Sequence, residues 1–345
     1  MKVVIASAHV PFIVGGGTRI VDDLDRALSA AGHTTEIVSL PVWETWDQLP
    51  AQLLAFRLID IHASADRLIA IRTPSHLLRH PSKVVWFLHH HRGAYDLWGT
   101  EYQDIPDTTE GRLVRSLVMK SDDLAFAEAQ AIFANSPTTR ERLRKFNGID
   151  APVLYPPLSS ADDYYCNANE GYVFLPSRIN TIKRQALAVQ AMSHVRSGTR
   201  LIIAGPPDTP QALENLERLI EEHNLKDRVT LLSRWISEQE KRDLFANCLG
   251  CLFIPYDEDS YGYVGLEACH SRKPLVTCTD SGGVTSLVVD EKTGFIVEPS
   301  PHEIGEAIDR LAADPRQSRE MGQNAHQQLA ILGISWHRVV EALTN

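Results

Sequence analysis

The stretch PYDEDSYGYVGLEACHSRKPLVTCTDSGG, residues 255–283, joins three kinds of sequence in succession. An acidic and aromatic loop comes first, a segment of helical character begins near Val264, and the buried-strand pattern PLVTC leads to two glycines. A short apolar run bounded by turn residues is typical of a strand in a parallel sheet. Because ligands bind outside the carboxyl ends of such strands, the polar loop indicates a binding edge.

The rest of the chain repeats this arrangement, since strand-like runs alternate with helical patterns throughout. This alternation predicts two Rossmann-like doubly wound α/β domains, and a chain of 345 residues is long enough for two hydrophobic cores. Strands are expected at residues 2–7, 35–40, 59–64, 83–89 and 131–135, and then at 172–177, 200–205, 228–233, 251–255, 274–278 and 294–297. We expect the two domains to face each other across a cleft.

The boundary between the domains is expected near VLYPPLSS, where two prolines interrupt the chain. We assign residues 1–157 to the N-terminal domain and 158–334 to the C-terminal domain. Residues 335–345 are expected to form an amphipathic helix that packs back on the first domain. Helices are also predicted from about Gly17 to a cap at Gly32, from Ser136, and from the capping box at residues 237–240.

The composition excludes several classes of protein. The chain has 34 Lys and Arg against 44 Asp and Glu, a formal net charge of -10, which argues against nucleic-acid binding because phosphate backbones need a basic face. The apolar run at the N-terminus is too short for the core of a signal peptide, and no apolar run is long enough to span a membrane. We therefore expect a cytoplasmic protein. Five cysteines, an odd number, indicate reduced thiols, and we expect Cys248 and Cys251 to be buried.

Two segments are candidates for binding a phosphate group. Gly15 and Gly16 lie in the loop PFIVGGGTR before a helix, where backbone N–H groups and the helix dipole favour an anion. The spacing is not G-x-G-x-x-G, which disfavours a dinucleotide-dependent dehydrogenase. Arg178 and Lys183 follow the first strand of the second domain and suit a diphosphate, whereas we expect Arg184 to be solvated.

Three consecutive histidines end the fourth strand, in WFLHHHRGAYDLWG. Neighbouring side chains of a strand alternate in direction, so the three cannot converge on one metal ion, and no metal site is predicted. His89 is the best candidate for contacting a bound ligand, and His91 is the second.

The opening stretch offers a second anion site and two carboxylates. Backbone N–H groups of Tyr263 and Val264, at the start of a helix, would point at an anion. Glu267, one turn further, could accept hydrogen bonds from vicinal hydroxyls, and Asp259 in the preceding loop could hold a second polyol such as a hexose.

These residues carry a family resemblance. The motif of Asp259, Tyr261, Gly262, Glu267 and Ala268, followed by KPLVTCTDSGG and GFIV, resembles the E-x7-E region of the GT4 family of retaining glycosyltransferases, which have the GT-B fold. Asp259 stands where that family has a glutamate. GGGT with LDRALSAAGHTTEIV, SRINTIKR and RVTLLSRWISEQEKRDLFANC resemble further segments of the family, so the resemblance covers nearly the whole chain.

The resemblance implies transfer of a hexose from a nucleoside diphosphate sugar to a hydroxyl of a glycan, lipid-linked or small-molecule acceptor, with retention giving an α-glycoside. A UDP-sugar is favoured, then a GDP-sugar, and neither a cofactor nor an obligate metal is implied. The implied roles are diphosphate binding by Gly16, Arg178, Lys183 and the backbone of Tyr263 and Val264; base contacts by Arg234, Trp235 and Ile236; ribose binding by Glu267; and sugar contacts by Asp259 and His89.

Three alternatives stay open. The sequence DED at residues 257–259 matches the D-x-D motif of metal-dependent GT-A transferases. A GT-B epimerase or phosphorylase would use the same donor site, and so would a non-catalytic sugar-nucleotide binding protein. The acceptor is expected near Arg92, Tyr95, Asp96 and Trp98, and a weak peripheral contact with a membrane is a further expectation.

Overall fold

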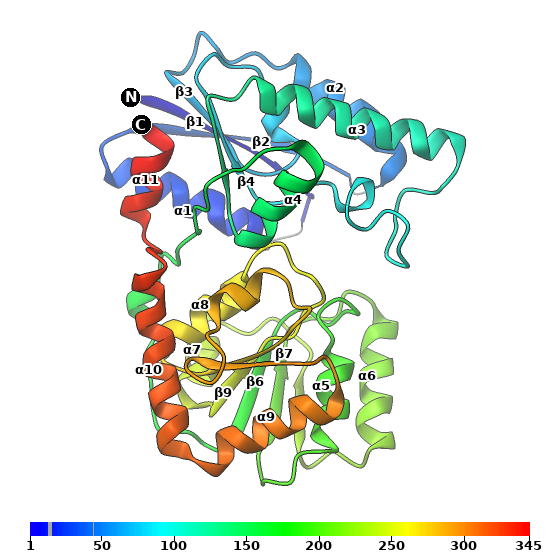
Figure 1. Ribbon diagram of the computed structural model, residues 1–345, viewed down its shortest axis with the longest axis vertical. Helices are drawn as coiled ribbons and strands as arrows, with labels where there is room; N and C mark the ends of the chain where they lie inside the picture. The colour runs from blue at the N-terminus through cyan, green and yellow to red at the C-terminus, as the bar shows by residue number, and fades with distance from the viewer. Residues whose placement is uncertain (13–15, 44) are drawn as a thin grey trace. The chain divides into compact units, whose positions relative to one another are not determined.

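The computed structural model describes residues 1–12, 16–43 and 45–345. The chain divides into two compact units, and each contains one parallel sheet (Figure 1). The first unit comprises Met1–Pro157 and Ile334–Asn345, and the second comprises Leu158–Gly333. The predicted class, α/β with two Rossmann-like sheets, is confirmed.

The sheet of the first unit has the strand order β2-β1-β3-β4-β5, and every pair is parallel. Its strands are β1 (Lys2–His9), β2 (Thr34–Pro41), β3 (Arg67–Ala70), β4 (Lys83–Phe87) and β5 (Ala131–Ala134). Its helices are α1 (Gly16–Ala30), α2 (Leu49–Leu58), α3 (Thr109–Ala127), α4 (Pro137–Asn147) and α11 (Trp336–Thr344), with short 3-10 turns η1 (Trp46–Gln48), η2 (Ser75–Leu77) and η3 (Arg92–Ala94).

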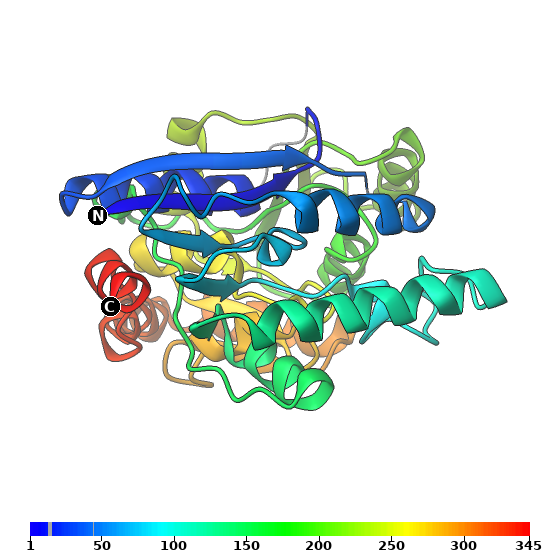
Figure 2. The ribbon, with the colours of Figure 1, turned by 90° about the horizontal axis from the view of Figure 1, so that it is seen from above.

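Helices cover both faces of this sheet. Successive side chains of a strand point to opposite faces, so each strand contributes to two cores. Val4 and Ala6 pack into a core with α2 and α3, which lie side by side in both views (Figures 1 and 2). Val3 and Ile5 pack into a second core with α1 and α11. The C-terminal helix α11 therefore belongs to the first unit, where Val339 is fully buried.

One predicted strand is wrong. Residues 59–64 form turns, with one isolated bridge at Asp60, and the third strand is β3 at Arg67–Ala70. The Asp60 carboxylate accepts a hydrogen bond from His62 N at 2.9 Å, which stabilises a turn. Ile59 and Ile61 alternate with polar residues, which is the pattern of a half-exposed strand and led to the wrong prediction. A central strand of a parallel sheet is instead a continuous apolar run.

The sheet of the second unit has the strand order β11-β10-β9-β6-β7-β8, again all parallel. Its strands are β6 (Tyr172–Pro176), β7 (Arg200–Ala204), β8 (Val229–Leu232), β9 (Gly250–Leu252), β10 (Leu275–Cys278) and β11 (Gly294–Val297). Its helices are α5 (Gln185–Met192), α6 (Pro210–Glu222), α7 (Glu238–Asn247), α8 (Gly262–His270), α9 (Pro301–Ala313) and α10 (Pro315–Ile331), with 3-10 turns η4 (Ala161–Asp163) and η5 (Gly283–Leu287).

The predicted helix ends are confirmed by their capping bonds. Ser136 Oγ accepts a hydrogen bond from Thr139 N at 3.0 Å at the start of α4, and Ser237 Oγ accepts one from Glu240 N at 3.1 Å at the start of α7. Gly32 follows α1 with φ of +86°, the left-handed conformation that a glycine adopts after a helix.

The prediction that Cys248 and Cys251 are buried is confirmed. All five thiols are free, and Cys248, Cys251, Cys269 and Cys278 are buried. Burial raises the pKa of Cys248, Cys269 and Cys278 to about 12, so these thiols stay protonated and unreactive at neutral pH. In the part of the chain that the structure describes, no helix combines the length and apolar character needed to cross a membrane.

The histidine that ends α8 links the stability of the second unit to pH. The His270 ring lies 5.7 Å, between centroids, from His326 on α10. Burial, assisted by His326 and opposed by Asp162, lowers the pKa of His270 from 6.5 to about 4. The unfolded chain therefore binds a proton near pH 6.5 that the folded chain takes up only near pH 4, and stability falls as the pH drops through this window.

We expect His270→Gln to lose less stability than the wild-type protein between pH 7 and pH 5, measured by urea denaturation at both values. His302→Gln is the matched control, because the His302 side chain is 55% exposed. An equal loss of stability in the His270 variant and the wild type would contradict the assignment.

Candidate functional site

The strand order of the second unit places a topological switch point, where α/β proteins bind ligands, at the carboxyl ends of β6 and β9. The chain runs from β6 outward to β7 and β8 and then returns to β9 on the other side of β6, so a topological switch point lies between β6 and β9. Arg178 and Lys183 follow β6, and residues 253–264 follow β9. Two contacts join these loops: Tyr256 N donates to Ile182 O at 2.8 Å, and Lys183 Nζ lies 2.5 Å from Glu258 Oε1.

The two predicted diphosphate-binding cations both have carboxylate partners. Arg178 NH1 lies 3.0 Å from Asp208 Oδ1, and its side chain is 45% exposed. Lys183 is more enclosed, with a side chain that is 21% exposed beside Glu258. Lys183 is thus the more enclosed of the two cations, and Arg178 is more exposed beside Asp208, to which Asn180 Nδ2 also donates.

The Phe253 ring borders both the Lys183 ammonium group and the start of α8. Lys183 Nζ is 5.5 Å from the centroid of the Phe253 ring, and a Cβ on Gly262 would meet the same ring at 2.9 Å. Gly262 has φ of +68°, so this helix can begin here only with a glycine. Tyr263 and Val264 follow in the first turn of α8. An ammonium group and a helix N-terminus, both of which favour an anion, therefore border the same ring.

Glu267 lies one turn further along α8, and only 2% of it is exposed. Lys241 Nζ on α7 donates to Glu267 Oε1 at 2.7 Å, which compensates the charge of this buried carboxylate. Sequence reasoning did not find Lys241, because its only local role is as an ordinary helix residue after the Ser237 cap.

Asp259 is half-buried in a loop that is held by the turn at Gly282 and Gly283. A Cβ on Gly282 would lie 2.2 Å from Glu258 O, and one on Gly283 would lie 2.7 Å from Asp259 O. Glycines are therefore required at both positions for the close backbone approach.

A buried glutamine fixes the loop of Arg178, and sequence reasoning also missed it. Gln185 is 1% exposed, and its Nε2 donates to Ser177 Oγ at 2.7 Å and to Arg178 O at 2.8 Å. Arg184 was expected to be solvated, and this expectation is wrong. Its guanidinium group donates to both oxygens of Asp280 at 2.7 and 2.6 Å, and its side chain is only 19% exposed.

The predicted base-binding residues lie in the loop after β8, at the edge of the sheet. Trp235 is 67% exposed, and Ile236 is partly buried. Arg234 donates to both carboxylate oxygens of Glu240 at 2.9 and 2.6 Å, and this hydrogen bonding raises the pKa of Arg234.

In the first unit, the strand order changes direction between β1 and β3, which places a second switch point at their carboxyl ends. Gly16 opens α1 there, while Gly15 lies outside the described residues. A Cβ on Gly17 would lie 3.0 Å from Arg72 Nε, so a cation that sequence reasoning missed borders this helix N-terminus. Because a strand was wrongly predicted at residues 59–64, the end of β3 at Ala70, which would have marked Arg72 as a candidate, was not recognised.

The strand expected to reach His89 ends at Phe87, so the three histidines follow β4, and each has different surroundings. His89 is half-buried, its Nδ1 is 2.8 Å from His90 O, and its own carbonyl accepts a hydrogen bond from Thr73 Oγ1 at 2.8 Å. His90 is a core residue, 1% exposed, with Nε2 2.8 Å from Asn147 Oδ1. His91 Nε2 lies 3.3 Å from Asp104 Oδ2.

The expected acceptor-contacting set needs a correction at Tyr95. Its side chain is 3% exposed and donates a hydrogen bond to Asp122 Oδ2 at 2.7 Å, so it is a core residue, and burial raises its pKa. Arg92 and Asp96 form an ion pair at 2.6 Å with side chains only 16% and 12% exposed. Trp98 is partly buried beneath the Arg115 guanidinium group, at 4.7 Å.

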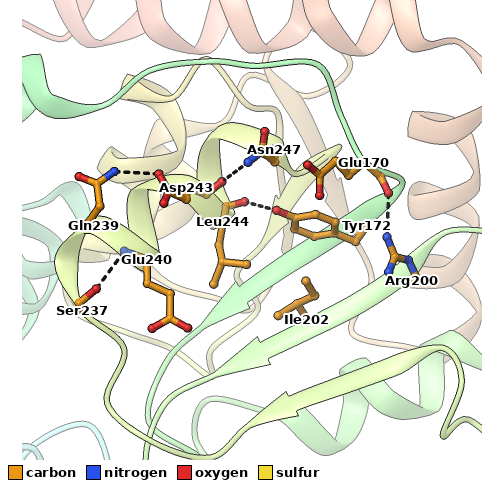
Figure 3. Close-up of a pocket in the computed structure, with 10 residues that line it drawn as sticks. All are labelled: Glu170, Tyr172, Arg200, Ile202, Ser237, Gln239, Glu240, Asp243, Leu244 and Asn247. Carbon is orange, nitrogen blue, oxygen red and sulfur yellow. Dashed lines mark hydrogen bonds between the residues drawn. The ribbon is translucent and has the colours of Figure 1, made fainter.

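A hollow of 440 Å³ lies elsewhere in the second unit, between α7 and the first residues of β6 and β7 (Figure 3). Tyr172 Oη donates to Leu244 O at 2.8 Å, and Arg200 donates to Glu170 O at 2.9 Å (Figure 3). The hollow runs along α7 from the amino ends of β6 and β7, at Tyr172 and Arg200, to Glu240, which pairs with Arg234 of the predicted base-binding loop.

A group of potential metal ligands in the described residues is His302, Glu303 and Glu306, all exposed on α9. His302 Nε2 is 3.6 Å from Glu306 Oε1, an ordinary surface pair of a helix at positions i and i+4. These side chains do not include Asp257 or Asp259 of the D-x-D motif. Because the chain has two parallel Rossmann-like sheets, the GT-A alternative is wrong.

Comparisons with known proteins agree with this architecture. Residues 164–328, most of the second unit, match the family described as Glycosyl transferases group 1. The alpha-1,3/1,6-mannosyltransferase ALG2 of Homo sapiens is 26% identical over 91% of this chain and 88% of its own length.

Two solved structures show the same fold. Sucrose-phosphate synthase from Thermosynechococcus elongatus is 19% identical with a TM-score of 0.78, over 98% of this chain and 96% of that chain. HepE from Anabaena, solved in complex with UDP, is 16% identical with a TM-score of 0.73 over 100% of both chains. The two units thus have the GT-B fold, the second resembles the group 1 glycosyltransferases, and these matches support a hexosyltransferase of GT4-like type.

Proposed function

We propose that this glycosyltransferase moves a hexose from a nucleoside diphosphate sugar, with a UDP-sugar favoured over a GDP-sugar, to a hydroxyl of a glycan, lipid-linked or small-molecule acceptor. Retention of configuration would give an α-glycoside. The observation that carries the proposal is that Lys183 and the start of α8 both border the Phe253 ring, at the switch point between β6 and β9. The solved structure of HepE with UDP supports a uridine donor for this chain.

In this proposal, catalysis comes from stabilising the departing diphosphate. Negative charge grows on the diphosphate as the bond to the sugar breaks, and fixed positive groups lower the energy of that state. Lys183, Arg178 and the N–H groups of Tyr263 and Val264 supply those groups without an obligate metal. Glu267 would accept hydrogen bonds from the ribose hydroxyls, and Asp259 would hold the donor sugar.

The remaining roles complete the proposal. Gly16 would contribute backbone N–H donors to the diphosphate, and Arg234, Trp235 and Ile236 would contact the base. His89 would contact the transferred hexose. Exposed aromatic surface such as that of Trp235, which is 67% exposed, suits stacking on a base.

We also propose a cytoplasmic location with weak contact to a membrane surface, which would suit a lipid-linked acceptor. The neighbouring helices α2 and α3 expose several leucines, and apolar side chains that gather on a surface can mark a site of membrane contact. Leu54 and Leu58 on α2 are 58% and 69% exposed, and Leu113 on α3 is 67% exposed.

The donor base is tested by calorimetric binding of UDP, GDP, ADP and NAD, with and without EDTA. We expect UDP to bind equally well with EDTA present, and NAD not to bind. Turnover is then followed as release of UDP from UDP-sugars in the presence of hydroxyl acceptors, with the anomer of the product read by NMR. Binding that needs a metal would contradict the proposal. Binding without any turnover would contradict it too and would favour a sugar-nucleotide binding protein.

Arg178→Ala and Lys183→Ala should each weaken UDP binding by about 10- to 100-fold, the loss of one charge-assisted contact. Thermal stability should change little, because exposed ion pairs contribute about 0–1 kcal/mol. Arg218→Ala and Lys226→Ala are matched controls, since both residues form ion pairs with glutamates in the same unit, at 2.8 and 2.5 Å. Equal affinity in all four variants would refute the assigned pair.

Glu258→Gln should strengthen UDP binding by about 3- to 10-fold. The carboxylate competes with a diphosphate for Lys183 and repels its charge, and the amide does neither. Glu221→Gln is the control. Glu221 pairs with Lys226 at 2.5 Å, and neither residue belongs to the proposed site. Weaker binding by Glu258→Gln would contradict competition and indicate that Glu258 orients Lys183.

A further inference from the structure

Arg184 joins the loops that follow three different strands of the second unit. Its guanidinium group donates to both Asp280 oxygens at 2.7 and 2.6 Å, and Asp280 follows β10. Its carbon Cζ lies 4.9 Å from the centroid of the Tyr256 ring, in the loop after β9. Arg184 itself ends the loop after β6. A bidentate salt bridge and a ring contact together fix the position of a guanidinium group closely.

The backbone at Arg184 has an unusual conformation. Its φ and ψ are +57° and +36°, the left-handed region that residues other than glycine, asparagine and aspartate rarely adopt. Asp257, opposite, has φ of +45°. Unfavourable conformations of this kind persist only where surrounding contacts hold them, and they are frequent at functional sites.

The partners of Arg184 hold the loop that carries Asp259. Asp257 N donates to Asp280 O at 2.8 Å, and Gly283 N donates to Glu258 O at 2.7 Å. On its other side, Tyr256 N donates to Ile182 O at 2.8 Å. The segment 256–260 is therefore bonded to the loop after β6 and to the loop after β10. Arg184, at the end of the loop after β6, contacts the loop after β9 through Tyr256 and the loop after β10 through Asp280.

We propose that Arg184 is a positioning residue of the donor site: through Asp280 and Tyr256 it sets the place of residues 256–260, and with them Glu258, Asp259 and the start of α8. The inference rests on the proposed function, because it assigns Arg184 a role in donor binding. Arg184 acts through these neighbours, whereas Lys183 is the residue proposed to contact the diphosphate.

Arg184→Gly separates the side chain from the backbone, because glycine adopts the left-handed conformation without penalty. We expect this variant to bind UDP about 10-fold more weakly, with a higher KM for the donor and an unchanged KM for the acceptor. Hydrogen exchange of peptides covering residues 256–260 and 280–284 should become at least about 10-fold faster, since the loop loses its anchor. Arg184→Lys, which keeps the charge but not the bidentate geometry, should recover only part of the affinity.

Arg310→Ala is the matched control, because Arg310 also pairs with a carboxylate, Glu291 at 2.7 Å, and lies 4.2 Å from a ring, that of Phe295. It should leave UDP affinity and exchange of residues 256–260 unchanged. Wild-type affinity in Arg184→Gly, with or without faster exchange, would overturn the positioning role. If the wild-type protein bound no nucleoside diphosphate, the proposed function would fail, and the positioning role with it; the exchange experiment would still decide whether Arg184 anchors the loop.

Discussion

The pairing of β6 with β9 is the constraint on which the second unit depends. The chain builds the sheet outward from β6 to β8 and then returns to pair β9 with β6 from the other side. Parallel strands place all their carboxyl ends at one edge, and the polar residues that follow β6, β9 and β10 meet there. Removing this pairing would leave Lys183 and the start of α8 without a common location.

Charge at this edge is balanced by specific pairs. The cations Arg178, Lys183 and Arg184 face Asp208, Glu258 and Asp280 respectively. This pairing suits a chain with a formal net charge of -10, which has no excess of positive groups to spread over a surface. An anion would therefore bind here by replacing a carboxylate partner and by using the helix N-terminus, and not through long-range attraction to a basic face.

Most of the strands could be predicted because strands covered on both faces are continuous apolar runs, and β6, β7 and β10 are of this kind. The prediction failed at residues 59–64, where Ile59 and Ile61 pack against the core from turns. Side-chain surroundings were harder to predict than strands. Tyr95 was expected near an acceptor but is buried against Asp122, and Arg184 was expected in solvent but is held by Asp280.

The sequence by itself determined the two-sheet class, the helix caps at Ser136 and Ser237, and the loops in which candidate residues lie. These features depend on periodicity and on hydrogen bonds between residues that are neighbours in the chain. Only the tertiary structure decided the partners: Lys241 for Glu267, Glu258 for Lys183 and Asp280 for Arg184, which are separated by 26, 75 and 96 residues. Such pairs form because parallel strands bring distant loops to one edge, and no local pattern in the sequence encodes that meeting.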